Sequence, residues 1–135
     1  SDFFERNRAS YYDALMRVRV SNDLLHWVKF FLSAVIETAS KGKQTFEGIL
    51  ALRHEVDAQA FGYGKRAENV QTLLKHLYRR PAVTAGQASE ILGVSHQSAS
   101  ALLNKMAEDG ILDEITGYQR NRVFMFTRYL QLFRT

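Results

Sequence analysis

The sequence contains no cysteine, only one proline, and no apolar run that approaches the length of a membrane span. The absence of cysteine excludes disulfide bonds and thiolate metal sites, and it is typical of proteins in a reducing compartment. A membrane-spanning helix needs about 20 consecutive apolar residues, so we expect no membrane partner. We therefore expect a cytoplasmic chain that folds without covalent cross-links.

The residue patterns of familiar catalytic and metal sites are also missing. Histidines at i and i+4 on a helix would suggest zinc, but the four histidines are far apart. They are His26, His54, His76 and His96. Ser95 next to His96 is not a catalytic dyad, because catalytic partners are recognised by geometry and Ser95 is needed as a helix cap. We predict no catalytic residue, no metal site and no cofactor in this chain.

Charge is distributed unevenly along the 135 residues, whose net charge is +4. Residues 1–64 carry eight Lys or Arg against eight Asp or Glu, whereas residues 65–135 carry ten against six. Hydrophobic residues make up 46% of the chain, which is enough to build a core. The whole basic excess therefore lies in the second half, which permits a nucleic-acid partner there.

The first half is expected to be helical. One helix starts near Asp2 and stops at a break at residues 21–23. A second helix is predicted from Leu24 to Ala60, because its apolar residues keep one phase at steps of three and four. They are Leu25, Val28, Leu32, Val35, Ala39, Phe46 and Ile49. This phase continues past Gly42, which favours one long helix with any kink at Gly42, although a break there stays open.

The N-terminal helices carry more aromatic residues than two short helices can hide. These are Phe3, Phe4, Trp27, Phe30 and Phe31. Exposed apolar patches of this kind drive association. We therefore expect a homodimer formed through residues 1–64.

The pattern of residues 65–135 predicts a helix followed by a helix-turn-helix. Residues 67–78 show one apolar face and stop before Pro81. Thr84 and Gln87 fit a capping box, and Gly93 fits the end of that helix. Ser95 then caps a helix that ends at Gly110. Its inward stripe is Ala99, Leu102, Leu103 and Met106.

Two β-prone runs follow this motif. Residues 111–116 and 122–127 flank a polar turn at residues 117–121, which predicts a hairpin. The order helix, helix-turn-helix and hairpin is that of a winged helix. The expected fold is therefore mainly α, with N-terminal helices including one long helix, then a winged helix-turn-helix domain with a small β-hairpin. Gly62 and Gly64 mark the boundary between domains 1–61 and 65–135.

Two sets of residues form the candidate DNA- or partner-binding surface. The outward face of the second motif helix carries Gln97, Ser98, Ala101, Asn104 and Lys105. The hairpin turn carries Gln119, Arg120, Asn121 and Arg122. Gln and Asn can read adenine with two hydrogen bonds, and arginines on a hairpin suit phosphates. Strand alternation would put both arginines on one side if the strand already begins there. Double-stranded DNA and a protein are both candidate partners, because a fold does not fix function.

Aromatic and helical spacing near both ends of the chain follows the pattern of a known family. Near the start are Asn7-Arg8, Tyr11-Tyr12, Leu15, Trp27, Phe30-Phe31-Leu32 and Thr38-Ala39. Near the end are Gly117, Arg120-Asn121-Arg122, Val123, Phe124 and Tyr129-Leu130. Together they resemble the C-terminal region of Fic (filamentation induced by cAMP) family proteins. The resemblance covers nearly the whole chain. It implies that residues 1–61 complete a helical catalytic domain and that a regulatory or partner-binding winged helix follows.

Fic enzymes transfer AMP from ATP to protein hydroxyls with a His-Pro-Phe motif that runs into Gly-Asn-Gly-Arg. This chain has no His-Pro pair, since Pro81 follows Arg80, so no catalytic residue carries over. The resemblance implies an excised accessory part of an adenylyltransferase that begins downstream of the motif and is no enzyme alone. ATP and a divalent metal would belong to the parent domain. The alternative is a free-standing transcription regulator that dimerises through its long helix and binds DNA through residues 95–105 and the wing.

Overall fold

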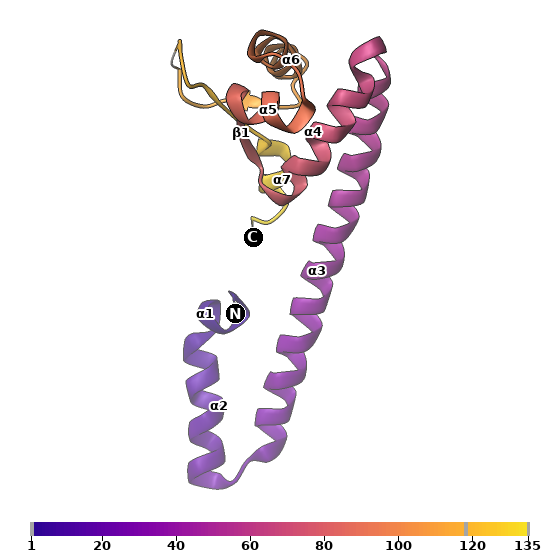
Figure 1. Cartoon of the computed structure of the whole chain (residues 1–135). Helices are drawn as coiled ribbons and strands as arrows, with labels where there is room; N and C mark the ends of the chain where they lie inside the picture. The colour runs from indigo at the N-terminus through magenta and orange to yellow at the C-terminus, as the bar shows by residue number, and fades with distance from the viewer. Residues whose placement is uncertain (1, 118, 135) are drawn as a thin grey trace. The chain divides into compact units, whose positions relative to one another are not determined.

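The computed structural model describes residues 2–117 and 119–134, and it is mainly helical with one small antiparallel sheet (Figure 1). The predicted fold class is confirmed. The elements, in chain order, are α1 (Asp2–Arg6), α2 (Arg8–Ser21), α3 (Leu24–Phe61), the 3-10 turn η1 (Gly64–Arg66), α4 (Ala67–Arg79), β1 (Ala82–Thr84), α5 (Ala85–Leu92), α6 (His96–Glu108), β2 (Asp113–Glu114), β3 (Val123–Met125) and α7 (Thr127–Gln131). No helix in the described part of the chain is long and apolar enough to cross a membrane.

The contacts of the chain form two compact units, residues 1–47 and residues 48–135. The helix α3 begins in the first unit and ends in the second. In the second unit its residues Leu52, Val56 and Ala60 are buried in the core that also holds the helix-turn-helix. The predicted domains 1–61 and 65–135 stay a prediction.

The long helix predicted over residues 24–60 is confirmed, and α3 continues through Gly42 without interruption. The predicted break at residues 21–23 is also present. Asn22 takes a left-handed conformation (φ 55°), and the Asp23 carboxylate accepts a hydrogen bond from the His26 N–H at 3.1 Å. The prediction of a single first helix is wrong in one respect, because the helix is interrupted at Asn7, between α1 and α2. The Asn7 amide donates to the Phe3 carbonyl oxygen at 3.0 Å.

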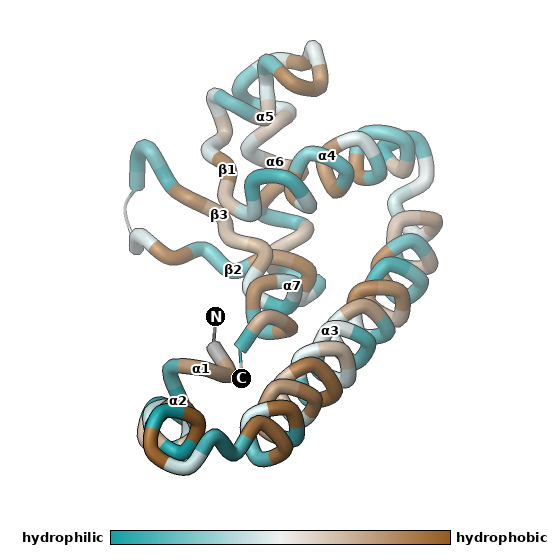
Figure 2. The backbone as a smooth tube through the Cα atoms, turned by 90° about the horizontal axis from the view of Figure 1, so that it is seen from below, coloured by the Kyte–Doolittle hydropathy of each residue, from teal (hydrophilic) through white to brown (hydrophobic). Residues whose placement is uncertain are grey.

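Most of the N-terminal aromatic rings cover one another, so the prediction that they are exposed is wrong. The cluster comprises Phe3, Phe4, Tyr11, Trp27 and Phe30, with neighbouring ring centroids 5.4–6.3 Å apart. Phe31 does stay exposed. The remaining exposed apolar surface of α3 is chiefly aliphatic, and Figure 2 shows hydrophobic turns recurring along this helix. We call the exposed residues Leu25, Val28, Leu32 and Val35 the α3 stripe.

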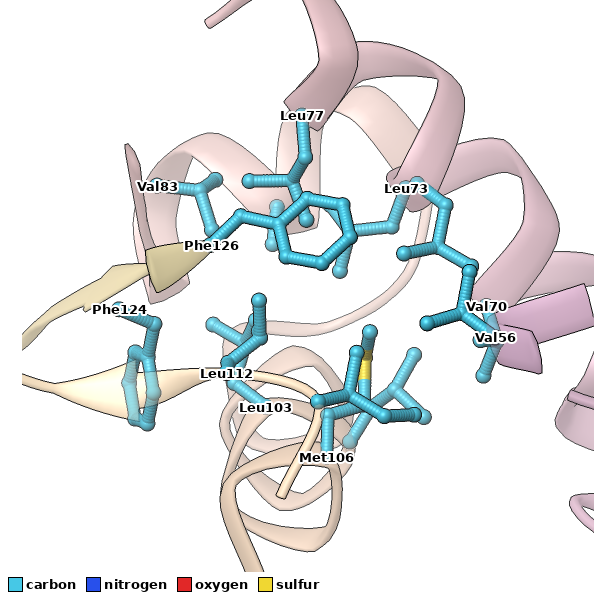
Figure 3. Packing of buried hydrophobic residues seen from close by; sticks show 14 of the residues in the cluster. Val56, Val70, Leu73, Leu77, Val83, Leu103, Met106, Leu112, Phe124 and Phe126 are labelled. Atoms are coloured by element: carbon cyan, nitrogen blue, oxygen red, sulfur yellow. The ribbon is translucent and has the colours of Figure 1, made fainter. Parts of the chain in front are cut away.

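The second unit is a winged helix built around one apolar core. The helices α4 and α6 each bury one face, and the sheet has the order β1-β3-β2, with Val83 opposite Phe124 and Glu114 opposite Phe124. Side chains from the helices and the sheet meet in this core (Figure 3). Its fully buried large residues include Val70, Leu73, Leu74, Leu77, Leu103, Met106, Ile111, Leu112, Phe124 and Phe126.

The predicted helix boundaries of the motif are confirmed by their caps. The Gln87 N–H donates to the Thr84 hydroxyl oxygen at 3.2 Å, and the Thr84 N–H donates to the Gln87 side-chain oxygen at 3.0 Å. Gly93 ends α5 in the left-handed conformation with φ 66°. The Ser95 hydroxyl accepts from the Ser98 N–H at 3.1 Å and so starts α6. These short-range signals therefore fix the start of both helices and the end of α5.

The predicted strands are longer than the observed ones. Ile111 and Leu112 are buried but precede β2, and β3 ends at Met125 because α7 begins at Thr127. Neither β1 nor α7 was predicted. The strand β1 exists through its pairing with β3, a contact across about 40 residues of chain. In α7, the Arg128 guanidinium lies 2.6 Å from the Glu55 carboxylate and joins this segment to α3.

Candidate nucleic-acid interface

The helix α6 separates a buried stripe from an exposed polar face. The predicted inward residues Ala99, Leu102, Leu103 and Met106 are all buried. The predicted outward residues Gln97, Ser98, Ala101, Asn104 and Lys105 are all exposed. We call this second set the reading face. Small side chains such as Ala101 let a helix approach a groove closely, while amides can contact base edges.

The only cation of the reading face is already engaged within the protein. The Lys105 ammonium lies 3.1 Å from the Asp109 carboxylate, one helical turn later. Asp109 also accepts a hydrogen bond from the Tyr63 hydroxyl at 2.6 Å. The Tyr63 hydrogen bond, followed by that from Lys105, lowers the pKa of Asp109, so this carboxylate stays charged. Lys105 is therefore a weaker phosphate contact than its charge alone suggests.

The base of the wing is organised by Glu114. Its carboxylate accepts hydrogen bonds from the Thr116 hydroxyl, from the Thr116 N–H at 3.2 Å and from the Gly117 N–H at 3.0 Å. The Thr116 hydroxyl, followed by the Gly117 N–H, lowers the pKa of Glu114. Gly117 is left-handed with φ 67°, a conformation that favours glycine. The wing thus leaves the sheet through a turn fixed by a carboxylate.

The condition for placing the two wing arginines by strand alternation is not met, because β3 begins at Val123, after both of them. Asn121, which lies between them, is left-handed with φ 55°. The turn residues Gln119, Arg120 and Asn121 are exposed, whereas Tyr118 lies outside the described residues. Arg122 turns toward α6, where its Nη1 donates to Asn104 Oδ1 at 3.1 Å. The structure thus joins the two predicted sets of residues.

A cleft of about 420 Å³ opens between the wing and the helix-turn-helix. It is lined by Thr84, Ala85, Gly86, His96, Ser100, Gln119, Arg120, Asn121 and Arg122. No acidic residue is found among these described lining residues, and Ala85 and Gly86, the first two residues of α5, belong to the same wall. Arginines and helix N-termini both favour a negatively charged ligand. The cleft has the electrostatic character of a phosphate-contacting surface.

Sequence reasoning found the wing part of this cleft and missed the α5 part. Thr84 and Ser95 were used as caps, and their capping role already implied that the helix starts after them lie at the surface. The residues next to these caps, Ala85, Gly86 and His96, carry no side-chain signal of binding. Their contribution depends on how the wing folds over them, which the spacing of residues along the chain does not reveal.

Comparison with known families gives a match over part of the chain. The MarR family model matches residues 72–117, from α4 through both motif helices to the start of the wing. No curated protein matches the chain. The resemblance to Fic proteins is overturned, because no Fic family model matches and MarR is a family of free-standing regulators. The adenylyltransferase parent therefore has no support. In residues 72–117 the chain is similar to the MarR family.

Proposed function

We propose that this chain is a winged-helix regulator that binds double-stranded DNA. The observation that carries the proposal is the cleft between wing and motif, which is lined by Arg120, by Arg122 and by Ala85 and Gly86 at the start of α5. The similarity of residues 72–117 to the MarR family, whose winged helices bind DNA, supports the same function.

In this proposal the reading face of α6 enters the major groove. Gln97 and Asn104 contact base edges there, while Arg120 lies against a phosphate beside the groove. The peptide N–H groups at Ala85 and Gly86 contact a further phosphate through the positive end of α5. Affinity then comes chiefly from the wing and the start of α5, and sequence preference comes from α6.

We further propose that a second copy of the chain covers the α3 stripe. Its residues Leu25, Val28, Leu32 and Val35 step by three and four over three turns, the spacing of a coiled-coil seam. Their exposed fractions are 45–65%, which is unusual for aliphatic side chains so close together. MarR winged helices usually act as dimers, which supports the same assignment. A cytoplasmic location stays a prediction.

Salt dependence of DNA binding tests the first proposal. The parent chain is titrated by fluorescence anisotropy against duplex DNA of mixed sequence at salt from about 50 to 200 mM. We expect binding that weakens with salt, and the Arg120→Ala variant should lower the slope by about 0.9, since one phosphate contact is lost. Arg134→Ala is the matched control, because Arg134 is also exposed but lies outside the cleft. No binding at low salt would favour a protein partner on the same surface.

Light scattering tests the dimer. The Leu32→Glu variant should be monomeric at concentrations where the parent chain is a dimer, because it places a charge in the α3 stripe. Gln44→Glu adds the same charge at an exposed polar position of α3 that lies outside the stripe, so it should remain a dimer. A monomeric parent chain would contradict the assignment.

A further inference from the structure

The wing and the reading face are joined by a side-chain hydrogen bond whose chemistry fixes an orientation. Arg122 Nη1 lies 3.1 Å from Asn104 Oδ1, although the two residues are 18 positions apart. A guanidinium has only donors, so the asparagine must turn its oxygen toward it and its NH2 group away. Without such a partner, an exposed asparagine amide can rotate and exchange the positions of its oxygen and nitrogen.

We propose that Arg122 sets base preference by holding Asn104 in the orientation that reads adenine. Asparagine reads adenine by accepting from N6 and donating to N7. The amide oxygen has two lone pairs, of which Arg122 uses one, so the other lone pair and the NH2 group remain for the base. Arg122 is thus a positioning residue that acts through Asn104. This inference rests on the proposed DNA-binding function and deepens it.

The neighbouring polar residues show why this pair is distinctive. Gln97 shares the reading face, yet its amide makes no hydrogen bond within the part of the chain that the structure describes. Lys105 is engaged by Asp109. Arg120 is exposed on the same wing and lines the cleft, but no described contact brings it to Asn104. Fixing a side chain before binding removes part of the entropic cost of the contact. The amide of Asn104, unlike that of Gln97, is therefore held in one orientation before DNA binds.

Selection from a pool of duplexes with a randomised centre tests the assignment, with the parent chain, Arg122→Met, Asn104→Ala and the double variant. Methionine keeps the long side chain but removes the donors and the charge. Arg120→Met is the matched control, because it removes an equal charge from the same wing. We expect the parent to prefer adenine about tenfold at one position, as for a bidentate contact. Arg122→Met should reduce this preference about fivefold, and Asn104→Ala should abolish it.

Comparing Arg122→Met with the double variant distinguishes a positioning role of Arg122 from a contact with phosphate. In the Asn104→Ala background, Arg122→Met should lower overall affinity without changing the preference at that position. Arg120→Met should lower affinity for all sequences alike. If Arg122→Met behaves as Arg120→Met does, with the adenine preference intact, the assignment is wrong. Selection of another base at the position that depends on Asn104 would also overturn it.

A measurement on the free chain distinguishes this failure from failure of the proposed function. The Asn104 side-chain NH2 pair is assigned in a ¹⁵N–¹H NMR spectrum by its loss in Asn104→Ala. Arg122→Met should shift this pair, while Arg120→Met should leave it in place. An unshifted pair overturns the hydrogen bond whether or not DNA binds. A shifted pair in a chain that binds no duplex at low salt instead overturns the proposed function, and the assignment of base preference with it.

Discussion

The packing of Gly48 against Leu132 gives a prediction whose magnitude depends on two opposing effects. A Cβ placed on Gly48 would lie 2.9 Å from Leu132 Cδ2, closer than side chains tolerate. The same addition at Gly42, six residues earlier in α3, meets nothing within 4 Å among the described residues. The two glycines therefore differ in their surroundings within one helix.

Replacing a glycine by alanine inside a helix stabilises it by about 1 kcal/mol, because the unfolded chain loses freedom. At Gly48 the Leu132 side chain must move by about 0.5 Å or more, at a cost of about 0.5–1.5 kcal/mol for a rotamer away from its minimum. Leu132 is only half-buried, so it has room to adjust. We expect Gly48→Ala to change the free energy of unfolding by less than about 0.5 kcal/mol.

Urea denaturation followed by circular dichroism measures this change. The sole tryptophan, Trp27, lies in the first unit, so its fluorescence reports that unit separately. In a Leu132→Ala background the obstacle is gone, and Gly48→Ala should stabilise the second unit by about 1 kcal/mol. A loss above about 2 kcal/mol that is equal in both backgrounds would refute the reasoning, because it would mean that Leu132 does not occupy this space.

Three further outcomes follow from the caps, the wing and the core. Ser95→Ala should destabilise the second unit by about 1 kcal/mol in urea, and a change below about 0.3 kcal/mol would contradict its capping role. Glu114→Gln should be less stable than the parent at pH 7. The hydrogen bonds to Glu114 lower its pKa in the folded protein. Their contribution to stability is therefore fully present above the ordinary pKa of 4.5 and is lost as the pH falls through the pKa of the folded state. A difference independent of pH between 7 and 3 would show that ionisation of Glu114 is not involved. Leu103→Ala should cost about 2–5 kcal/mol in the same assay, and a smaller loss would mean that the core collapses around it.

The helices of the motif could be predicted because their signals are local. The capping residues Thr84 and Ser95 lie three positions from the N–H groups that they bind, and the stripe that contains Leu103 repeats within one helix. Such patterns need no knowledge of the rest of the fold. The continuity of α3 through Gly42 was predictable for the same reason, since the apolar phase is preserved on both sides.

The remaining features depend on contacts between distant segments. The strand β1 is three residues long and forms because β3 lies beside it. Strand alternation does not place the wing arginines, because the chain turns at Asn121 before the strand begins. In the candidate site, exposure of the reading face followed from periodicity. The bond between Arg122 and Asn104 did not, because it requires the exact path of the wing.

Asp109, the residue that follows α6, accepts two hydrogen bonds from residues near the end of α3. Tyr63 donates to the Asp109 carboxylate at 2.6 Å, and the Gln59 amide donates to the Asp109 carbonyl oxygen at 3.3 Å. Helix ends ordinarily fray, and their amide hydrogens exchange with solvent by small local openings. Here the final turn of α6 cannot open without releasing Tyr63, whose ring is buried in the core. Amide exchange in that turn should accordingly follow the opening of the whole second unit, so α6 keeps its full length in the folded protein.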